Sequence, residues 1–324
     1  MKKLIALLCV VAMAIGITAC GSSDSKKEES KTYKIGICQL VQHEALDTAT
    51  KGFKDYLTDK LGDRVEFDEQ NASGEATNCS TICNQFVSEN DDLIMANATP
   101  ALSAAVSATK EIPILGTSVT SYGVALGIDG WKGGAVGGNV SGTSDLAPLD
   151  EQAAMVKEIF PDTKNVGIVY CSSEPNSKYQ SEVITDHFKE LGISTKEYTF
   201  SDSNDVASVT KAACADSDVL YIPTDNTAAS CAKAINNIAL KAKVPIIAGE
   251  EGICSGCGVA TLSISYYDLG QKTGEMAYNI LEKGEDISKM EVQSAPKFTK
   301  KYNEEICKTL GVEIPEGYEK IEVK

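Results

Sequence analysis

Polar side chains follow most of the apolar segments of this chain, at positions where a small molecule could be bound. They are Gln39, His43, Asn71, Thr99, Ser118, Thr120, Glu174, Asn176, Ser177, Asp225 and Glu250. Hydroxyl groups and the free N–H groups of helix starts bind carboxylates, and carboxylates bind ammonium groups. The set therefore predicts a site for a small ligand that carries both charges, such as an amino acid. For each residue alone, the alternative is a cap on the next helix, because Ser, Thr, Asn and Asp are common cap residues.

Roles within this predicted site follow from residue type and place. Asn176 and Ser177 open one expected helix and Thr99 opens another, so we expect them to bind the ligand's carboxylate. Asp225 is the first candidate for the ammonium group and Glu174 is the second. A helix cap is again the alternative for Asp225. The side chain of the ligand would contact an apolar pocket made by Leu40, Val41, Leu46 and Tyr122.

The residue types that enzymes use are sparse in this chain. It has two histidines: His43, either a ligand contact or a polar group at a helix start, and His187, expected within a helix. The sequence contains no Gly-x-Ser-x-Gly motif and no glycine loop of the kind that binds phosphate. We therefore expect no catalytic residues, no enzyme activity and no cofactor.

The pattern of cysteines suggests buried free thiols more than disulfide bonds. Nine of the eleven lie beyond residue 31, so they cannot all pair. Cys79 and Cys83 are four residues apart on one expected helix face, which predicts free thiols there. Cys254 and Cys257 stand among glycines that favour a loop, where a redox pair, half of a metal site or a local disulfide are alternatives. Without a second Cys/His pair at a fitting spacing, we expect no metal.

Apolar strand patterns alternate with amphipathic helix patterns, which is typical of an α/β fold with parallel sheets. Strands are expected at residues 33–40, 65–69, 93–98 and 113–117, and again at 165–170, 196–200, 218–223 and 245–248. Gly36 and Pro113 are 77 residues apart, and Gly167 and Pro245 are 78 apart. The two halves therefore repeat one βα rhythm, which predicts two similar open lobes.

Ligands of open parallel sheets bind beyond the carboxyl ends of the strands, so two facing lobes predict a hinged cleft. The first lobe is expected to hold residues 32–143 and about 251–284. The second is expected to hold about 144–250 and 285–324. The candidate polar residues should line the cleft from both sides.

The first 31 residues predict export and anchoring. Two lysines, a short apolar run and small residues before Cys20 indicate a signal peptide over residues 1–19. The segment around Cys20 resembles a bacterial lipobox, which implies lipidation of Cys20 and attachment to the outer face of a membrane. Residues 20–31 lack apolar side chains beyond the cysteine and are expected to form a tether. The net charge of −16 argues against binding to nucleic acid.

Several short motifs together resemble one protein family. They are Gln39 to Asp47 leading to Gly52-Phe53, Asn71 to Gly74, Ala98 to Pro100, Asn139 to Asp145, Glu174 to Ser177, and Asp225-Asn226. In this order they are similar to the tryptophan and aromatic amino-acid branch of bacterial ABC-transporter substrate-binding lipoproteins with a type I periplasmic-binding fold. The resemblance implies an amino-acid ligand delivered to an ABC permease and its ATPase, by a protein that we expect to be monomeric.

Other functions remain open from the sequence. Val119-Thr120 is followed by Ser121-Tyr122-Gly123, where that family usually has an Asp-Pro turn, so the chain departs from the family in a loop that would contact the ligand. A purine nucleoside or a sugar is the alternative ligand. A ligand-sensing lipoprotein without a transporter is the alternative function.

Overall fold

The computed structural model describes residues 31–295 and 297–322. The predicted signal peptide, the lipidation site at Cys20 and most of the predicted tether lie outside the described residues. Within the described part of the chain, no helix is both long enough and apolar enough to cross a membrane.

The first sheet has six parallel strands in the order β11-β5-β4-β3-β1-β2. Its strands are β1 (Tyr33–Gln39), β2 (Val65–Asn71), β3 (Leu93–Asn97), β4 (Ile114–Val119), β5 (Val140–Ser144) and β11 (Gln293–Ser294). The associated helices are α1 (Glu44–Leu61), α2 (Ala76–Glu89), α3 (Thr99–Ala108), α4 (Tyr122–Leu126) and α11 (Tyr266–Lys283), with short 3-10 turns at Gly62–Arg64 and Ile287–Lys289.

The second sheet has seven strands in the order β13-β12-β10-β9-β8-β6-β7. They are β6 (Asn165–Cys171), β7 (Ser194–Phe200), β8 (Val219–Ile222), β9 (Ile246–Ala248), β10 (Ala260–Ser263), β12 (Thr299–Tyr302) and β13 (Glu319–Lys320). The helices are α5 (Leu149–Ile159), α6 (Pro175–Glu190), α7 (Val206–Asp216), α8 (Asn226–Ser230), α9 (Ala232–Ala242), α10 (Glu251–Cys257) and α12 (Glu304–Leu310). Only the β10–β12 pair is antiparallel among the described strands.

The predicted internal repeat is confirmed by the strand orders. The run β4-β3-β1-β2 in the first sheet has its counterpart in β9-β8-β6-β7 of the second. In each sheet the second and third strands of the repeat lie on opposite sides of the first. A crevice therefore opens between the carboxyl ends of β1 and β3 in one sheet, and of β6 and β8 in the other. The predicted α/β fold with two parallel-dominated sheets is therefore correct.

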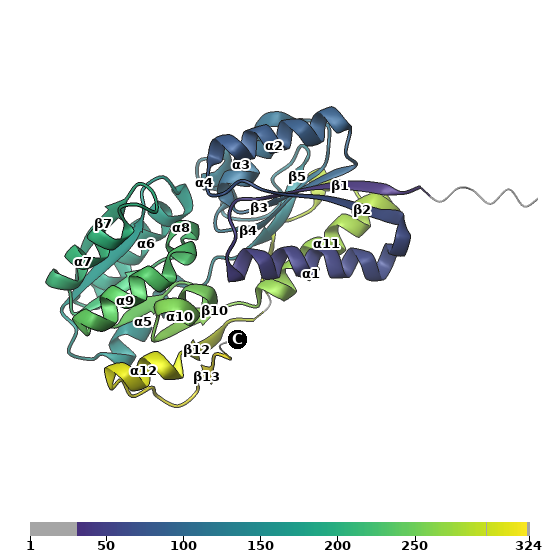
Figure 1. The fold of residues 1–324 in the computed structure, drawn as a ribbon. Coiled ribbons are helices and arrows are strands. Elements are labelled where there is room, and N and C mark those ends of the chain that lie inside the picture. The colour runs from purple at the N-terminus through teal and green to yellow at the C-terminus, as the bar shows by residue number, and fades with distance from the viewer. Residues whose placement is uncertain (1–30, 296, 323–324) are drawn as a thin grey trace, which may run out of the picture. The chain divides into compact units, whose positions relative to one another are not determined.

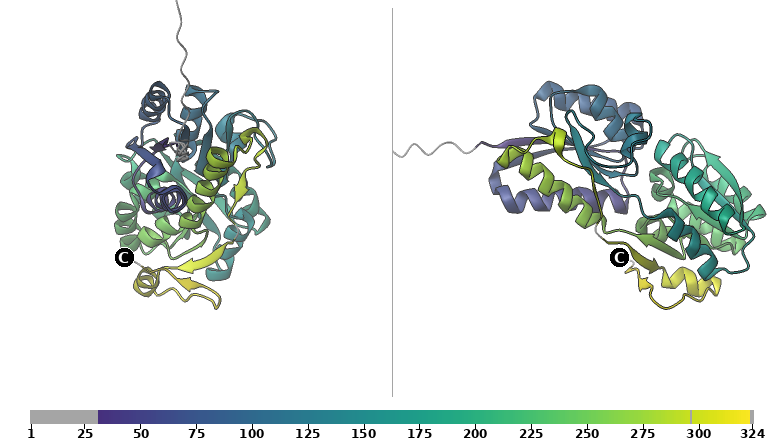
Figure 2. Two further views of the ribbon diagram at one scale, coloured as in Figure 1. Left: turned by 90° about the vertical axis from the view of Figure 1, so that its right-hand side faces the viewer. Right: turned by 180° about the vertical axis from the view of Figure 1, so that it is seen from behind.

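Helices cover both faces of each sheet (Figures 1 and 2). Each face has its own apolar core. In the first sheet, α2 and α3 bury one face and α1 and α11 the other. In the second sheet, α7, α9 and α10 lie over one face and α5, α6 and α12 over the other. This double cover explains why the central strands read as continuous apolar runs.

The boundaries predicted for the two lobes differ from the strand pairing in two places. β10 pairs with β9, so residues 251–263, expected with the first sheet, belong to the second. β11 pairs with β5, so residues 285–294, expected with the second sheet, belong to the first. These pairings join strands that are far apart in the chain, which local sequence patterns do not reveal.

The segment with Cys254 and Cys257 is also not the loop that its glycines suggested. Residues Glu251–Cys257 form α10, and the Glu250 side chain accepts hydrogen bonds from the backbone N–H groups of Gly252 and Ile253 at its start. Both cysteines are buried and free, as are Cys79 and Cys83. The helix cap outweighs the low helix propensity of two glycines.

Candidate functional site

A cavity of about 360 Å³ lies at the predicted strand ends and is lined by both sheets' loops. From the first sheet come Leu40, Val41, Ser73, Gly74, Glu75, Ala76 and Pro100; from the second come Cys171, Ser173, Glu174, Ser201, Asp202, Ser203, Asn226, Thr227 and Ser230. The lining therefore follows β1, β2 and β3 on one side and β6, β7 and β8 on the other. Of the predicted site residues, only Glu174 is part of it, together with the predicted apolar residues Leu40 and Val41.

Glu174 holds the start of α8 against the end of β6. Its Oε1 accepts hydrogen bonds of 2.8 Å from both the backbone N–H and the hydroxyl of Thr227. Its Oε2 accepts from the backbone N–H of Asn226 at 3.0 Å and from Asn226 Nδ2 at 2.6 Å. A buried carboxylate at a helix N-terminus is stabilised by such N–H groups. Glu174 thus forms part of the cavity wall, and both of its oxygens already accept hydrogen bonds from Asn226 and Thr227.

Asp225 caps the same short helix. Its Oδ1 accepts from the backbone N–H of Ala228 at 2.7 Å, and its Oδ2 accepts from that of Cys171 at 2.7 Å. The side chain is 1 % exposed. Burial, and then the neighbouring charge of Glu174, raise the pKa of Asp225. These contacts favour the cap that was the alternative for Asp225, and its ammonium-binding role stays a prediction.

Gln39, a predicted site residue, and the neighbouring Asn97 connect the ends of β1 and β3 to α1. Gln39 Nε2 donates to Asp47 Oδ1 at 2.6 Å, and Gln39 Oε1 accepts from the Thr50 hydroxyl at 2.7 Å. Asn97 Nδ2 donates to the same hydroxyl and to the Leu46 carbonyl, both at 2.9 Å. Leu46 itself is packed in the apolar core. Gln39 and Leu46 therefore hold α1 against the strand ends and do not line the cavity.

Several buried polar atoms at the strand ends have no hydrogen-bond partner. They are His43 Nδ1, Asn97 Oδ1, Thr99 Oγ1, Ser118 Oγ, Asp145 Oδ1 and Asn176 Oδ1. Two of these places also show strained backbone, since Ala98 has φ 95° and Ser118 has φ 53°. Native proteins satisfy nearly all buried polar groups, so unpaired atoms gathered at one edge indicate a place for a ligand or water. Strain at the same place is typical of functional sites.

His43 links the two sides. Its Nε2 lies 3.2 Å from Asn226 Oδ1. Because Asn226 Nδ2 donates to Glu174, Asn226 Oδ1 is the acceptor and His43 Nε2 carries the proton. Burial lowers the pKa of His43, which favours the neutral ring and leaves Nδ1 as an acceptor. His43 therefore joins the strand ends of the two sheets, and its contact with a ligand stays a prediction.

The other predicted residues have different surroundings. Asn71 is exposed and accepts from the Ser73 backbone N–H at 2.7 Å. Ser177 is fully buried beside Asp225. Thr120 is buried beside Asp145. Burial raises the pKa of Asp145, and the Thr120 hydroxyl partly lowers it again. Glu250 borders a separate hollow with Glu44, Ser265 and Tyr266.

Sequence reasoning missed part of this edge. Ser201, Asp202 and Ser203 follow β7 as the other candidates follow their strands, so the same rule would have found them. Asp145 follows β5, so the same rule also predicts it as a candidate. No group of three or more His, Cys, Asp or Glu side chains in the described ranges could hold a metal ion.

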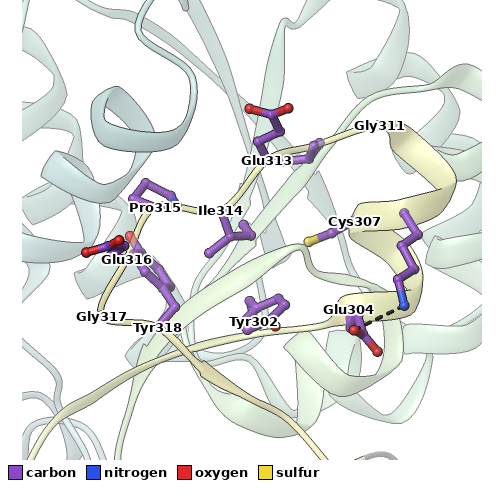
Figure 3. Close-up of a pocket in the computed structure, with 12 residues that line it drawn as sticks. Tyr302, Glu304, Cys307, Gly311, Glu313, Ile314, Pro315, Glu316, Gly317 and Tyr318 are labelled. Carbon is purple, nitrogen blue, oxygen red and sulfur yellow. Dashed lines mark ion pairs between the residues drawn. The ribbon is translucent and has the colours of Figure 1, made fainter.

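A further hollow of about 450 Å³ lies along the C-terminal segment, remote in sequence from these strand ends (Figure 3). Tyr302, Ile314 and Tyr318 line it, with Cys307 on α12. The Tyr318 hydroxyl donates to Glu158 at 3.0 Å, so this segment is fixed onto α5. It brings together none of the predicted site residues.

Comparisons with known proteins agree with this geometry. The family model described as ABC transporter substrate binding protein matches residues 34–322. A tyrosine-binding protein of Clostridioides difficile (strain R20291) is 37 % identical over 330 aligned positions, which cover 96 % of this chain and 93 % of the relative.

Two solved structures are also similar over nearly the full described length. One is an ABC domain in complex with L-Trp from Streptococcus pneumoniae, at 31 % identity and a TM-score of 0.84, covering 90 % of this chain and 100 % of that one. The other is the ligand-free, open structure of a substrate binding protein with adhesive properties from Clostridium difficile, at 38 % identity and a TM-score of 0.68, with the same coverage. With its strand-end cavity and its matching family model, the chain belongs to the ABC transporter substrate binding proteins.

Proposed function

We propose that this protein captures an aromatic amino acid of the tyrosine and tryptophan class for an ABC importer. The observation that carries the proposal is the strand-end cavity of about 360 Å³, together with the unpaired buried polar atoms on the loops and helix starts that follow the same strands. The tyrosine-binding relative and the L-Trp complex support the ligand class. A pocket with apolar walls and a few fixed polar groups is the usual form of a small-ligand site.

The chemistry of the edge suits the carboxylate and the side chain of such a ligand. Thr99 opens α3 and its hydroxyl is unpaired, so it and the N–H groups of that helix start can receive the carboxylate. Leu40, Val41 and Pro100 offer an apolar wall for a ring. A sugar is less well served, because Trp131 packs on Tyr122 with ring centroids 5.9 Å apart and does not line the cavity.

Binding measurements on the purified chain from residue 32 onward test the ligand class. We expect L-tyrosine and L-tryptophan to raise the melting temperature by mass action, and purine nucleosides and sugars to leave it unchanged. Calorimetric titration then gives the affinity of each hit. A shift with a nucleoside or sugar and none with any amino acid would refute the proposal.

A matched pair of variants connects binding to the cavity. Thr99→Val removes the unpaired hydroxyl and should weaken binding of the amino acid by roughly tenfold, as expected for a lost hydrogen bond to a charged group. Thr109→Val, beyond the far end of α3, is the control and should leave the affinity unchanged.

A substrate-binding protein performs no reaction of its own, so bound ligand should be recovered chemically unchanged. The family is one of extracytoplasmic binding proteins. We propose in addition that lipid on Cys20 anchors this member to the membrane and that an ABC permease and ATPase receive its ligand. Cys20→Ser should move the protein from the membrane fraction to the medium. Uptake that persists after deletion of the protein would favour the sensor alternative.

A further inference from the structure

Four buried carboxylates lie at or near the carboxyl ends of the strands, and three of them are occupied by helix starts. Glu174 and Asp225 accept the N–H groups at the start of α8, and Glu250 accepts those of α10. Each oxygen of these three groups has a donor within hydrogen-bond distance. None of them needs a ligand to complete its contacts.

Asp145 is the exception. It is 4 % exposed, and its Oδ2 accepts from the Tyr266 hydroxyl at 3.0 Å. The Thr120 hydroxyl lies close enough to lower the pKa of Asp145, but no hydrogen bond of ordinary geometry reaches its Oδ1. Among the described residues, none of the groups that shift its pKa is a lysine or an arginine. A buried carboxylate is costly unless it is paired with a cation or fully hydrogen-bonded. The contrast is Asp91, whose Oδ1 lies 3.2 Å from Lys34 Nζ.

The position of Asp145 fits the predicted ligand. It directly follows β5, and its backbone N–H donates to the Val119 carbonyl at 3.3 Å. It therefore lies on the strand-end edge beside Ser118, whose hydroxyl is also unpaired. Two strand intervals separate β5 from β3, or roughly 10 Å at about 4.8 Å each. An extended aromatic amino acid is long enough to reach from Asp145 toward Pro100, which lines the cavity at the start of the helix after β3.

We propose that Asp145 is the residue that accepts the ammonium group of the amino-acid ligand. The inference rests on the proposed function and deepens it, and it replaces Asp225 in that role. Tyr266, which donates to the second oxygen of Asp145, is a positioning residue that holds the carboxylate in place. The ligand's carboxylate would then lie toward Ser118 and Thr99, and its ring toward the apolar wall.

A pair of ligands that differ only in the amino group tests this assignment. L-Tyrosine is compared with 3-(4-hydroxyphenyl)propanoate by calorimetric titration of the wild type and of Asp145→Asn. The wild type should bind L-tyrosine at least tenfold more tightly than the analogue, because the analogue leaves the carboxylate unpaired. In Asp145→Asn this ratio should fall to about twofold or less, with the affinity for the analogue little changed.

Control variants separate recognition from structural support. Tyr266→Phe removes the supporting hydroxyl but keeps the carboxylate, so the ratio should fall only in part. Asp225→Asn should keep the wild-type ratio. A ratio that stays at tenfold or more in Asp145→Asn would overturn the proposal, as would an equal loss of affinity for both ligands.

Failure of the proposed function is distinguishable from failure of this inference. A wild type that binds neither compound but binds a nucleoside or sugar refutes the function. A wild type that binds L-tyrosine with an unchanged ratio in the variant refutes only the role of Asp145. If Asp145→Asn does not fold, a crystal structure of the wild type with L-tyrosine decides. The ligand nitrogen should lie within about 3.2 Å of an Asp145 oxygen, and any other partner for it overturns the assignment.

Discussion

At the residue scale, the buried carboxylates of this protein divide by what their oxygens accept. Asp225 accepts hydrogen bonds from the backbone N–H groups of Cys171 and Ala228, so it holds the start of α8 against the end of β6. Asp145 accepts a hydrogen bond from the Tyr266 hydroxyl and lies close to the Thr120 hydroxyl, but no hydrogen bond of ordinary geometry reaches its Oδ1. Two residues of one type, both buried at strand ends, thus have different uses because their neighbours differ.

Asp225→Asn should therefore lower stability more than it lowers ligand recognition. Asparagine has a single carbonyl oxygen, so one of the two backbone N–H groups would face an amide donor and stay unsatisfied. We expect the free energy of unfolding to fall by about 1–3 kcal/mol, measured by urea denaturation. Asp59→Asn, on the exposed face of α1, is the matched control. A tenfold loss of amino-acid affinity with unchanged stability would instead restore Asp225 as an ammonium ligand.

At the element scale, α1 and α11 pack with their backbones in close contact. Figure 1 shows the two helices beside the same sheet. A Cβ atom on Gly270 would lie 2.0 Å from the Ala49 carbonyl oxygen, and one on Gly52 would lie 2.2 Å from the Tyr267 carbonyl oxygen. Both distances are far below ordinary contact, so glycine is required on both helices. This packing fixes α11, which returns to the first sheet from the second, against α1.

Gly270→Ala should weaken this pairing. Alanine favours a helix over glycine by about 1 kcal/mol, but the new methyl group must push α11 away from α1. We expect the overlap to dominate and the free energy of unfolding to fall by about 1–3 kcal/mol. Lys272→Ala on the exposed side of the same helix is the control, with a change within about 0.5 kcal/mol. Increased stability in Gly270→Ala would show that the helices can separate freely.

At the scale of the whole molecule, burial raises the pKa of several carboxyl groups. The pKa is raised to about 6 for Asp145, to about 7 for Glu250 and to about 8 for Asp225, each mainly by burial. A carboxyl group with a raised folded-state pKa binds its proton more tightly in the folded state. The stability that it contributes is complete below the unfolded-state pKa near 4 and is lost as the pH rises through the folded-state value.

The ligand-free protein should therefore become less stable between about pH 5 and pH 8. Each group contributes a slope of at most about 1.4 kcal/mol per pH unit. Scanning calorimetry across this range measures the decline, and Glu250→Gln should flatten it by removing one titrating group. A melting temperature that rises steadily over this range would contradict the raised pKa values.

The described cysteines are free, and all but Cys231 are buried. Burial raises the pKa of Cys214 and Cys307, so few of these thiols are ionised near neutral pH. In a thiol-reagent titration of the chain from residue 32 onward, we expect one fast-reacting group in the native state. Nine should react after denaturation without reductant. Fewer than nine in the denatured protein would reveal a disulfide.

Much of the architecture could be predicted from local patterns. The apolar runs and helix periodicities placed most of the elements close to their observed bounds, and the matching spacing from Gly36 to Pro113 and from Gly167 to Pro245 indicated two similar sheets. These signals are local because hydrogen bonding within a helix and alternation within a strand involve near neighbours. The edge that carries the cavity followed from the same patterns, since parallel strands all end on one side.

The tertiary structure alone decided which polar residues are free for a ligand. Asp225 is occupied by Cys171, Asp145 contacts Tyr266, and His43 meets Asn226, all through partners more than fifty residues away. The same holds for β10 and β11, whose sheets depend on pairing with β9 and β5 rather than on their own residues. Residue type determines what a side chain can bind, but its partners are set by long-range packing, which short patterns in the sequence do not encode.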